Sequence, residues 1–242
     1  MKLCHFFMVD YKTSYAAAPI IGIAGPIAAG KTTLCRNLCK TLGWTMVPEP
    51  VKTNPYLPLF YKELEERHNQ EQLVGRKLDD GGHYGFAMQI FLLNKRFAQH
   101  QSMIWNKQPA IQDRTIYEDP IFALMLKKSG QISALDFQTY ADTYTNMTNF
   151  LHRPDLIIYL DVTPEKAFER LHSRGRDCEN NVPLEYLRNL REGYEDWIRN
   201  RLEGIPVLRI DWNDPLETNI VIELIEHTLG HKLVAKSEDI DE

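Results

Sequence analysis

The sequence predicts an α/β protein built on a doubly wound, five-stranded parallel sheet, and two observations lead to this prediction. Short runs rich in Ile, Val and Leu alternate with longer segments whose apolar residues recur at helical spacing, as in parallel strands joined by crossover helices. A glycine-rich loop joins the first expected strand to the first expected helix, where such folds bind phosphate groups. The 242 residues, of which 43% are hydrophobic and 25% charged, suffice for one domain with a buried core.

The expected elements alternate along most of the chain. Strands are expected at residues 19–24, 45–48, 110–113, 156–161 and 207–210. Helices are expected at residues 32–42, 86–101, 136–151, 164–172 and 184–201. Residues 62–82 break the rhythm, because they are strongly polar and end in two aspartates and two glycines, which indicates an inserted solvated helix and turn. No repeat or linker divides the chain, so we expect one domain over residues 1–233 and a disordered tail over 234–242.

The charge of the chain limits its partners. The net charge is −5, and four acidic residues lie in the last six positions, which leaves the remaining chain close to neutral. Nucleic acids and anionic membranes bind strongly basic surfaces, so we expect neither as a partner, and any phosphate bound should belong to a small molecule. The four cysteines show no zinc spacing and no disulfide framework, which favours a cytoplasmic location. A mitochondrial location is the weaker alternative, since the first residues contain no arginine.

The strongest signal is the loop after the first strand, which matches the pattern G-x-x-x-x-G-K-[ST]. Its residues are Gly25, Pro26, Ile27, Ala28, Ala29, Gly30, Lys31 and Thr32, and Thr33 follows at the start of the helix. In such a loop the backbone N–H groups and the helix N-terminus bind phosphates, while the lysine reaches the β- and γ-phosphates. The Thr32 hydroxyl can ligate Mg²⁺. The loop therefore predicts a nucleoside triphosphate with Mg²⁺, but not the molecule that receives the phosphate.

Two classes of phosphate-loop protein fit the remaining sequence poorly. A GTP-binding switch needs Asn-Lys-x-Asp, and the Asn-Lys pairs at 94–95 and 106–107 are not followed by that Asp. A motor or DNA-acting ATPase needs an apolar strand that ends in an acidic pair, but Asp161 is followed by Val162. A simpler reading of Asp161 is that it ends a buried strand. These observations favour the third class, a small-molecule kinase.

Such a kinase needs one carboxylate near the acceptor hydroxyl and another that helps to hold Mg²⁺. Glu49 follows the second strand between two prolines, which distinguishes it from a charge on a helix surface. Asp113 and Arg114 follow one another at the end of the third strand, where an arginine is costly to bury unless it pairs with a carboxylate or a ligand. We therefore expect Glu49, Asp113 and Arg114 to be catalytic.

A basic segment after the fourth strand supplies arginines that could neutralise the transferring phosphoryl group. Arg170 and Arg174 lie four residues apart on one face of an expected helix, and Arg176 follows a glycine. Alone, these residues would be a solvated helix end. Beside a phosphate loop they predict an arginine-rich lid over residues 170–179 that contacts ATP, with Arg174 and Arg176 as further catalytic residues.

Together these motifs resemble the deoxynucleoside kinases, particularly the bacterial-type deoxyadenosine and deoxyguanosine kinases, over about residues 21–212. The matching strings lie at residues 25–33, 48–51, 54–61, 89–97, 113–122 and 174–187. The resemblance implies a P-loop kinase fold, transfer of the γ-phosphoryl group of ATP to the 5′-hydroxyl of a deoxynucleoside in nucleotide salvage, and a homodimer. The segment between the string at 54–61 and that at 89–97 is longer than the family pattern. A nucleoside monophosphate kinase and a non-kinase regulatory module that binds nucleotide are the alternatives.

The resemblance also implies roles for individual residues. Glu49 would approach the 5′-hydroxyl, Arg114 would orient this region, and Asp113 would lie at the Mg²⁺ and phosphoryl end. Either carboxylate could be the base, and we choose Glu49 because a base must lie within reach of the proton that it removes. The implied nucleoside contacts are Tyr61 and Glu179 at the 3′-hydroxyl, Gln89 at the base edge, Phe122 stacked on the base, and Arg96 with Asp119 in the base pocket. The Arg96 and Asp119 pair resembles the arrangement of purine-accepting members.

Overall fold

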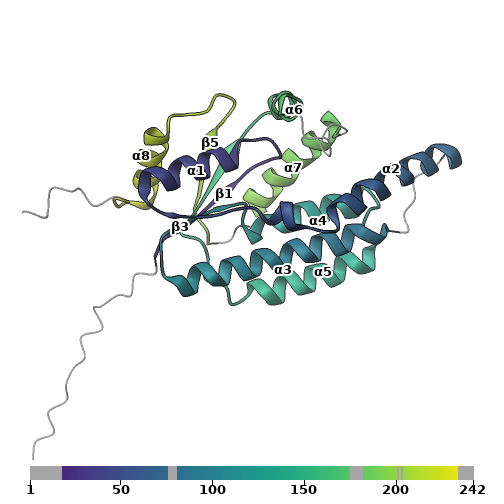
Figure 1. The fold of residues 1–242 in the computed structure, drawn as a ribbon, viewed down its shortest axis with the longest axis horizontal. Helices are drawn as coiled ribbons and strands as arrows, with labels where there is room; N and C mark the ends of the chain where they lie inside the picture. The colour runs from purple at the N-terminus through teal and green to yellow at the C-terminus, as the bar shows by residue number, and fades with distance from the viewer. Residues whose placement is uncertain (1–17, 76–80, 175–181, 201, 203, 234–242) are drawn as a thin grey trace, which may run out of the picture.

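A computed structural model shows one parallel sheet in the order β2-β3-β1-β4-β5, flanked by helices (Figure 1). The structure describes residues 18–75, 81–174, 182–200, 202 and 204–233. The strands are β1 (Ile20–Ala24), β2 (Thr45–Val47), β3 (Ala110–Asp113), β4 (Leu156–Asp161) and β5 (Val207–Asp211). All five strand predictions are confirmed, with ends that differ by at most one residue. Central strand β1 pairs with β3 and β4, so that Ile21 is opposite both Ile111 and Leu156.

Helices connect these strands and cover both faces of the sheet (Figure 1). Their bounds are α1 (Lys31–Leu42), α2 (Leu57–Val74), α3 (His83–Asn106), α4 (Asp119–Lys128), α5 (Ala134–Thr148), α6 (Pro164–Ser173), α7 (Leu184–Asn200) and α8 (Thr218–Leu229). Two short 3-10 turns, η1 (Pro50–Thr53) and η2 (Ile116–Glu118), precede α2 and α4. The five predicted helices are present. Helix α5 starts before its predicted first residue, because the Ser133 side chain caps its N-terminus by accepting a hydrogen bond from the Asp136 N–H.

Helices α4 and α8 were missed by the sequence analysis, and α2 was expected only in part. Helix α4 follows the short turn η2 directly, so no loop separates the two in the sequence. Helix α2 begins before the polar segment at 62–82 and extends into it. Its Glu63 carboxylate accepts hydrogen bonds from the N–H groups of His83 and Tyr84 and so caps the N-terminus of α3. The polar segment is thus attached to α3 by hydrogen bonds.

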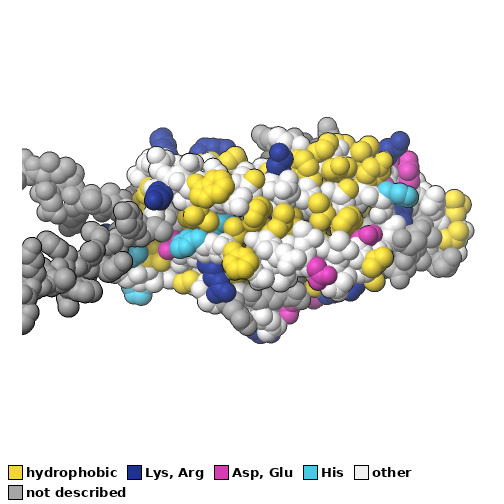
Figure 2. Space-filling model, turned by 90° about the horizontal axis from the view of Figure 1, so that it is seen from below, with side chains coloured by type: hydrophobic (Ala, Val, Ile, Leu, Met, Phe, Trp, Pro, Cys, Tyr) yellow, Lys and Arg dark blue, Asp and Glu magenta, His cyan; other side chains and the backbone are white. Residues whose placement is uncertain are grey.

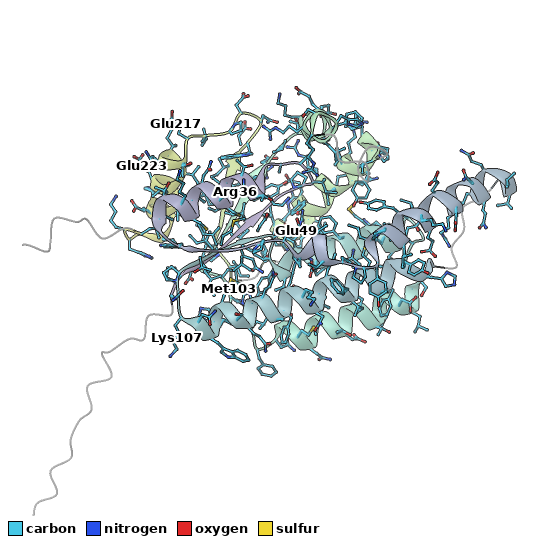
Figure 3. The ribbon with its side chains drawn as sticks, in the orientation of Figure 1. Arg36, Glu49, Met103, Lys107, Glu217 and Glu223 are labelled. Atoms are coloured by element: carbon cyan, nitrogen blue, oxygen red, sulfur yellow. The ribbon has the colours of Figure 1, made fainter. Side chains whose placement is uncertain are left out.

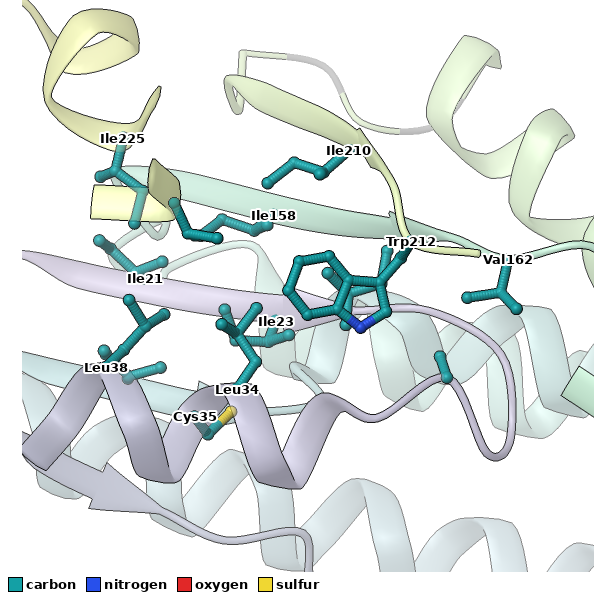
Figure 4. Close-up of a cluster of buried hydrophobic side chains, with 14 of the residues drawn as sticks. Ile21, Ile23, Leu34, Cys35, Leu38, Ile158, Val162, Ile210, Trp212 and Ile225 are labelled. Atoms are coloured by element: carbon teal, nitrogen blue, oxygen red, sulfur yellow. The ribbon is translucent and has the colours of Figure 1, made fainter. Parts of the chain in front are cut away.

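Two apolar clusters hold the helices on the sheet. On one face, Leu34, Cys35 and Leu38 of α1 pack against Ile21 and Ile23 of β1 (Figure 4). On the other face, α4, α5 and α7 pack against the alternate side chains of β4. Because β1 is buried along its whole length, its carboxyl end is fixed in position, and the phosphate loop begins there. This arrangement is the predicted doubly wound α/β fold.

The remaining predictions about organisation concern the whole chain. The described helices pack on one sheet or, as α2 does on α3, on a helix beside it, as a single domain over residues 1–233 would require, and that boundary stays a prediction. The predicted acidic tail at 234–242 lies outside the described residues. Among the described helices, none combines the length and the apolar character needed to cross a membrane.

Candidate active site

The predicted phosphate loop connects β1 to α1. Gly25 has a φ of 147° and Gly30 a φ of 98°, which are backbone conformations that favour glycine. A side chain at Gly25 would also bring a Cβ within 3.1 Å of the Leu160 carbonyl oxygen. The two glycines thus allow the tight path of the loop before the helix starts at Lys31. The sequence motif therefore predicted both the loop and the N-terminus of α1.

Lys31 is buried beneath this loop. Its Nζ donates hydrogen bonds to the carbonyl oxygens of Gly25 and Pro26, at 3.0 and 2.8 Å. Burial, together with the charge of Arg114, lowers the pKa of Lys31 to about 8, although nearby carboxylates oppose this shift. The Lys31 ammonium thus lies against the loop that, in related motifs, encloses the phosphates.

Thr32 and Asp113 meet at the carboxyl end of the sheet. Thr32 Oγ1 donates a hydrogen bond to Asp113 Oδ2 at 2.5 Å. The second carboxylate oxygen, Oδ1, is buried and has no hydrogen-bond partner among the described residues. A hydroxyl beside a carboxylate with an unused oxygen is a donor set suited to a hard divalent cation such as Mg²⁺. The two predicted metal ligands therefore lie together.

Glu49 connects the loop region to the residues predicted to line the base pocket. It follows β2 and lies near the middle of the molecule (Figure 3). Its Oε1 accepts hydrogen bonds from Arg114 Nε at 2.7 Å and from Arg96 Nη2 at 3.1 Å. Burial raises the pKa of this carboxyl, but Arg114, Arg96 and Lys31 outweigh burial and hold it at about 2. Glu49 is therefore ionised at neutral pH, and a quarter of its side chain is exposed.

Arg96 forms an ion pair with Asp119 as well as with Glu49. Burial raises the pKa of Asp119 to about 7, even though Arg96 and Arg114 favour its charged form. The Asp119 Oδ2 atom has no hydrogen-bond partner among the described residues. Gln89 is buried on α3 two turns before Arg96, and its Oε1 atom also lacks a partner there. Gln89, Arg96 and Asp119 thus supply buried polar groups, two of them with unused acceptor atoms.

The two predicted aromatic residues occupy different surroundings. The Phe122 ring lies 4.5 Å from the Arg114 guanidinium, on the first turn of α4. Tyr61 lies on α2 in an apolar cluster with Phe60, Met88 and Tyr84. Met88 is the sequence neighbour of Gln89, so this cluster joins α2 to the helix that carries two of the predicted base-pocket residues.

The predicted lid is only partly within the described residues. Arg170 lies against the phosphate loop, where Nη1 donates to the Ala29 carbonyl at 3.3 Å. Its Nη2 donates to the carbonyls of Trp212 and Asn213, at 2.9 and 2.6 Å. Arg174 is the C-terminal cap of α6. Arg176 and Glu179 lie outside the described residues.

Sequence reasoning assigned no role to two residues beside Arg114. Arg114 Nη1 donates to Tyr194 Oη at 2.6 Å and to Glu118 Oε2 at 3.3 Å, and both partners are fully buried. Thr115 and Glu118 have the spacing of a capping box, which is a usable sequence signal for the turn. Nothing in the sequence distinguishes Tyr194 from the other aromatic residues on the buried face of α7.

Comparisons with known proteins identify the family of this chain. The profile of the deoxynucleoside kinase family matches residues 21–229. A deoxyadenosine kinase of Dictyostelium discoideum is 43% identical over 206 residues, which are 85% of this chain and 77% of the relative. A deoxyadenosine/deoxycytidine kinase of Bacillus subtilis is 33% identical over 81% of this chain and 83% of its own length. The structure of a deoxyadenosine kinase from M. mycoides with bound dATP superposes with a TM-score of 0.69 at 31% identity, covering 88% of this chain and 99% of that one.

Proposed function

This chain belongs to the deoxynucleoside kinase family, and from that premise we propose that its preferred acceptor is a deoxynucleoside with a purine base. Members of the family are ATP-dependent kinases, and this chain phosphorylates deoxynucleosides with ATP. A nucleoside monophosphate kinase or a regulatory module is not favoured. The observation that carries the purine proposal is the pair of linked ion pairs in which the buried Arg96 bonds both to Glu49 and to the buried Asp119.

The proposed base pocket contains both hydrogen-bond donors and acceptors. Asp119 Oδ2 and Gln89 Oε1 lack partners among the described residues and can accept hydrogen bonds from an exocyclic amine. Arg96 can donate to a ring nitrogen, as arginine and amide side chains do when they read purine edges in DNA. Adenine offers both an amine and an acceptor nitrogen on one edge. The relatives named as deoxyadenosine kinases make deoxyadenosine the first candidate and deoxyguanosine the second.

The proposed transfer brings together the phosphate end of the site, which is the loop that binds ATP, and the acceptor end, which lies around Glu49. Lys31 and the loop N–H groups bind the phosphates of ATP. The 5′-hydroxyl of the nucleoside donates a hydrogen bond to Glu49, which Arg114 holds in place. As the 5′-oxygen bonds to the γ-phosphorus, the bond from that phosphorus to the ADP oxygen breaks and the hydroxyl proton passes to Glu49. Asp113 is less suited to be the base because one of its oxygens is bonded to Thr32.

Magnesium is the metal that this donor set fits. We propose that Thr32 and Asp113 hold it, directly or through water, since the buried Asp113 Oδ1 has no protein partner among the described residues. When bound, the ion would neutralise charge on the phosphates. In the lid, we propose that Arg174 and Arg176 contact the phosphates, while Arg170 supports the loop through the Ala29 carbonyl.

A panel of acceptors tests the proposed substrate. Purified protein is given ATP with Mg²⁺ and each of the four deoxynucleosides or a nucleoside monophosphate, and the products are measured. We expect deoxyadenosine and deoxyguanosine to have a higher kcat/KM than thymidine, with deoxycytidine as a secondary substrate. A preference for thymidine would contradict the purine proposal and leave the kinase assignment in place. Phosphorylation of monophosphates alone would contradict both.

We also propose that the chain forms a homodimer in the cytoplasm. The face over α3 and α5 carries a band of apolar side chains with few charges (Figure 2). Trp105, Leu135 and Phe150, at the ends of these helices, are 74%, 77% and 94% exposed. Such apolar exposure is typical of a protein interface. Light scattering coupled to gel filtration should give about 56 kDa, twice the 28.2 kDa of the chain, and Phe150→Asp should lower it.

A further inference from the structure

The Arg114 guanidinium donates hydrogen bonds to a buried cluster that includes Glu118 of η2 and Tyr194 of α7. The exposed fractions of Glu118 and Tyr194 are both 0%. Tyr194 Oη lies 2.6 Å from Glu118 Oε2, 2.6 Å from Arg114 Nη1 and 2.8 Å from the Gly25 carbonyl oxygen. Arg114 itself has a φ of 67°, a left-handed conformation that is unfavourable for a residue with a side chain. Its backbone and its guanidinium are therefore both fixed by their surroundings.

The Tyr194 hydroxyl links the other members of the cluster. It accepts a hydrogen bond from Arg114 Nη1 and has one proton to donate, which either the Glu118 carboxylate or the Gly25 carbonyl can accept. The Gly25 carbonyl also accepts from Lys31 Nζ at 3.0 Å and from Arg114 Nη2 at 3.4 Å. The Gly25 N–H lies 3.4 Å from Glu118 Oε2. The first peptide of the phosphate loop and the arginine beside Glu49 are thus bonded to the same two side chains.

Glu118 has a local structural task that uses only one of its oxygens. Oε1 accepts the hydrogen bond of the Thr115 N–H and completes the capping box of η2. The turn would need no charge for this purpose, and burying a carboxylate is costly without partners. Oε2 faces Arg114, Tyr194 and Gly25 instead. The second oxygen and the charge therefore serve the active-site cluster.

We infer that Glu118 and Tyr194 are positioning residues, which hold the Arg114 guanidinium against Glu49 and fix the first carbonyl of the phosphate loop. Through them the acceptor end and the phosphate end of the site share one rigid support. This inference rests on the proposed function, in which Arg114 orients the carboxylate that receives the proton. Neither residue touches the reacting atoms, and their effect on the rate is through geometry.

Tyr194→Phe is the main test, because it removes the hydroxyl and keeps the ring that stacks on Tyr159 and contacts Trp197 edge-on. We expect kcat to fall about tenfold, while the KM values for ATP and deoxyadenosine change less than about threefold. The matched control is Tyr159→Phe. Tyr159 is equally buried and stacks on Tyr194 with ring centroids 5.3 Å apart, but its hydroxyl has no hydrogen-bond partner among the described residues. The control should keep kcat within about twofold, since it removes a buried hydroxyl outside the cluster.

Glu118→Gln provides a second variant if Tyr194→Phe fails to fold. The amide oxygen can still cap Thr115, but the amide nitrogen then faces Arg114 and the Gly25 N–H, which are donors. The same loss of kcat is expected. The double variant should be little worse than either single variant, because both remove one support. An additive double effect would mean that the two residues act separately and would overturn the inference.

A measurement on Arg114 separates this inference from the proposed function. In arginine-labelled protein, the Nε–H signal of Arg114, identified by its loss in Arg114→Lys, should shift or broaden in Tyr194→Phe and stay unchanged in Tyr159→Phe. If the wild type phosphorylated no deoxynucleoside, the proposed function would fail and this signal would still decide the positioning role. An unchanged Arg114 signal, or an unchanged kcat in an active and folded Tyr194→Phe protein, would overturn the inference. An equal loss of kcat in Tyr159→Phe would assign the effect to packing.

Discussion

The proposed phosphate end and the proposed acceptor end of the site are assembled in different ways. The loop from Gly25 to Thr33 is one continuous segment, and its geometry follows from glycines at fixed positions and a helix that starts at Lys31. The acceptor end collects Glu49, Arg96, Arg114 and Asp119 from four elements, which meet only after the sheet and α3 have packed. A continuous segment carries its own geometry, whereas a dispersed cluster depends on every contact that positions its parts.

The largest effect should come from the carboxylate where these two ends meet. Glu49→Gln should lower kcat about 10²- to 10⁴-fold with little change in nucleoside affinity, because the amide retains size and hydrogen bonding but cannot accept the proton. Steady-state kinetics and nucleoside binding by calorimetry check this. Asp113→Asn is the comparison, and it should weaken the dependence of the rate on Mg²⁺. If Asp113→Asn instead reproduced the kcat loss and Glu49→Gln only weakened binding, the base would be Asp113.

The phosphate end is tested by Lys31→Ala. Loss of the ammonium group beside the phosphates should lower kcat on the order of 10²- to 10³-fold, since a preorganised charge at the transferring group is lost. The fold should persist, because within the described part of the chain the Lys31 ammonium bonds to carbonyl oxygens of its own loop. Circular dichroism and thermal unfolding serve as the control. A folded variant with near-normal turnover would contradict the proposal that Lys31 and its loop bind the phosphates of ATP.

The difference between the two ends also explains what the sequence could predict. The five strands, the loop and the pairing of Thr32 with Asp113 follow from local patterns and from the rule that parallel strands end at one edge. The polar network around Arg114 does not, because Tyr194 lies 80 residues away from it in the chain. Helix α4 was missed because it begins at Asp119, the residue directly after the end of η2, so that no loop marks its start in the sequence.

The base pocket should respond to removal of its ion pair. Arg96→Met combined with Asp119→Ala should shift the preference from purines toward pyrimidines, by about tenfold in the ratio of kcat/KM for deoxyadenosine to that for thymidine. Both residues are removed because loss of Arg96 alone would leave the buried Asp119 carboxyl without its ion-pair partner. Competition assays with the four deoxynucleosides measure the ratio. An unchanged ratio in a folded double variant would place base selection elsewhere.

The smallest expected effect is a pH dependence that belongs to the acceptor end alone. Burial raises the pKa of Asp119 to about 7, so its carboxyl changes from neutral to ionised across neutral pH. The ionised form is the better acceptor for the adenine amine, and kcat/KM for deoxyadenosine should therefore rise up to about tenfold from pH 6 to pH 8. Lys31, with a pKa of about 8, would lower the rate on the alkaline side, but the negative phosphates of saturating ATP favour the protonated form of Lys31 and so separate the two effects. Asp119→Asn should abolish the rise. A rise in kcat/KM that persists in Asp119→Asn would assign the titration to another group.

The stability of the fold tests the raised pKa of Asp119 independently of activity. A carboxyl whose pKa is raised by folding destabilises the fold as pH increases from about 4 to about 7. The unfolding free energy of Asp119→Asn relative to that of the wild type should therefore increase over that range and level off above it.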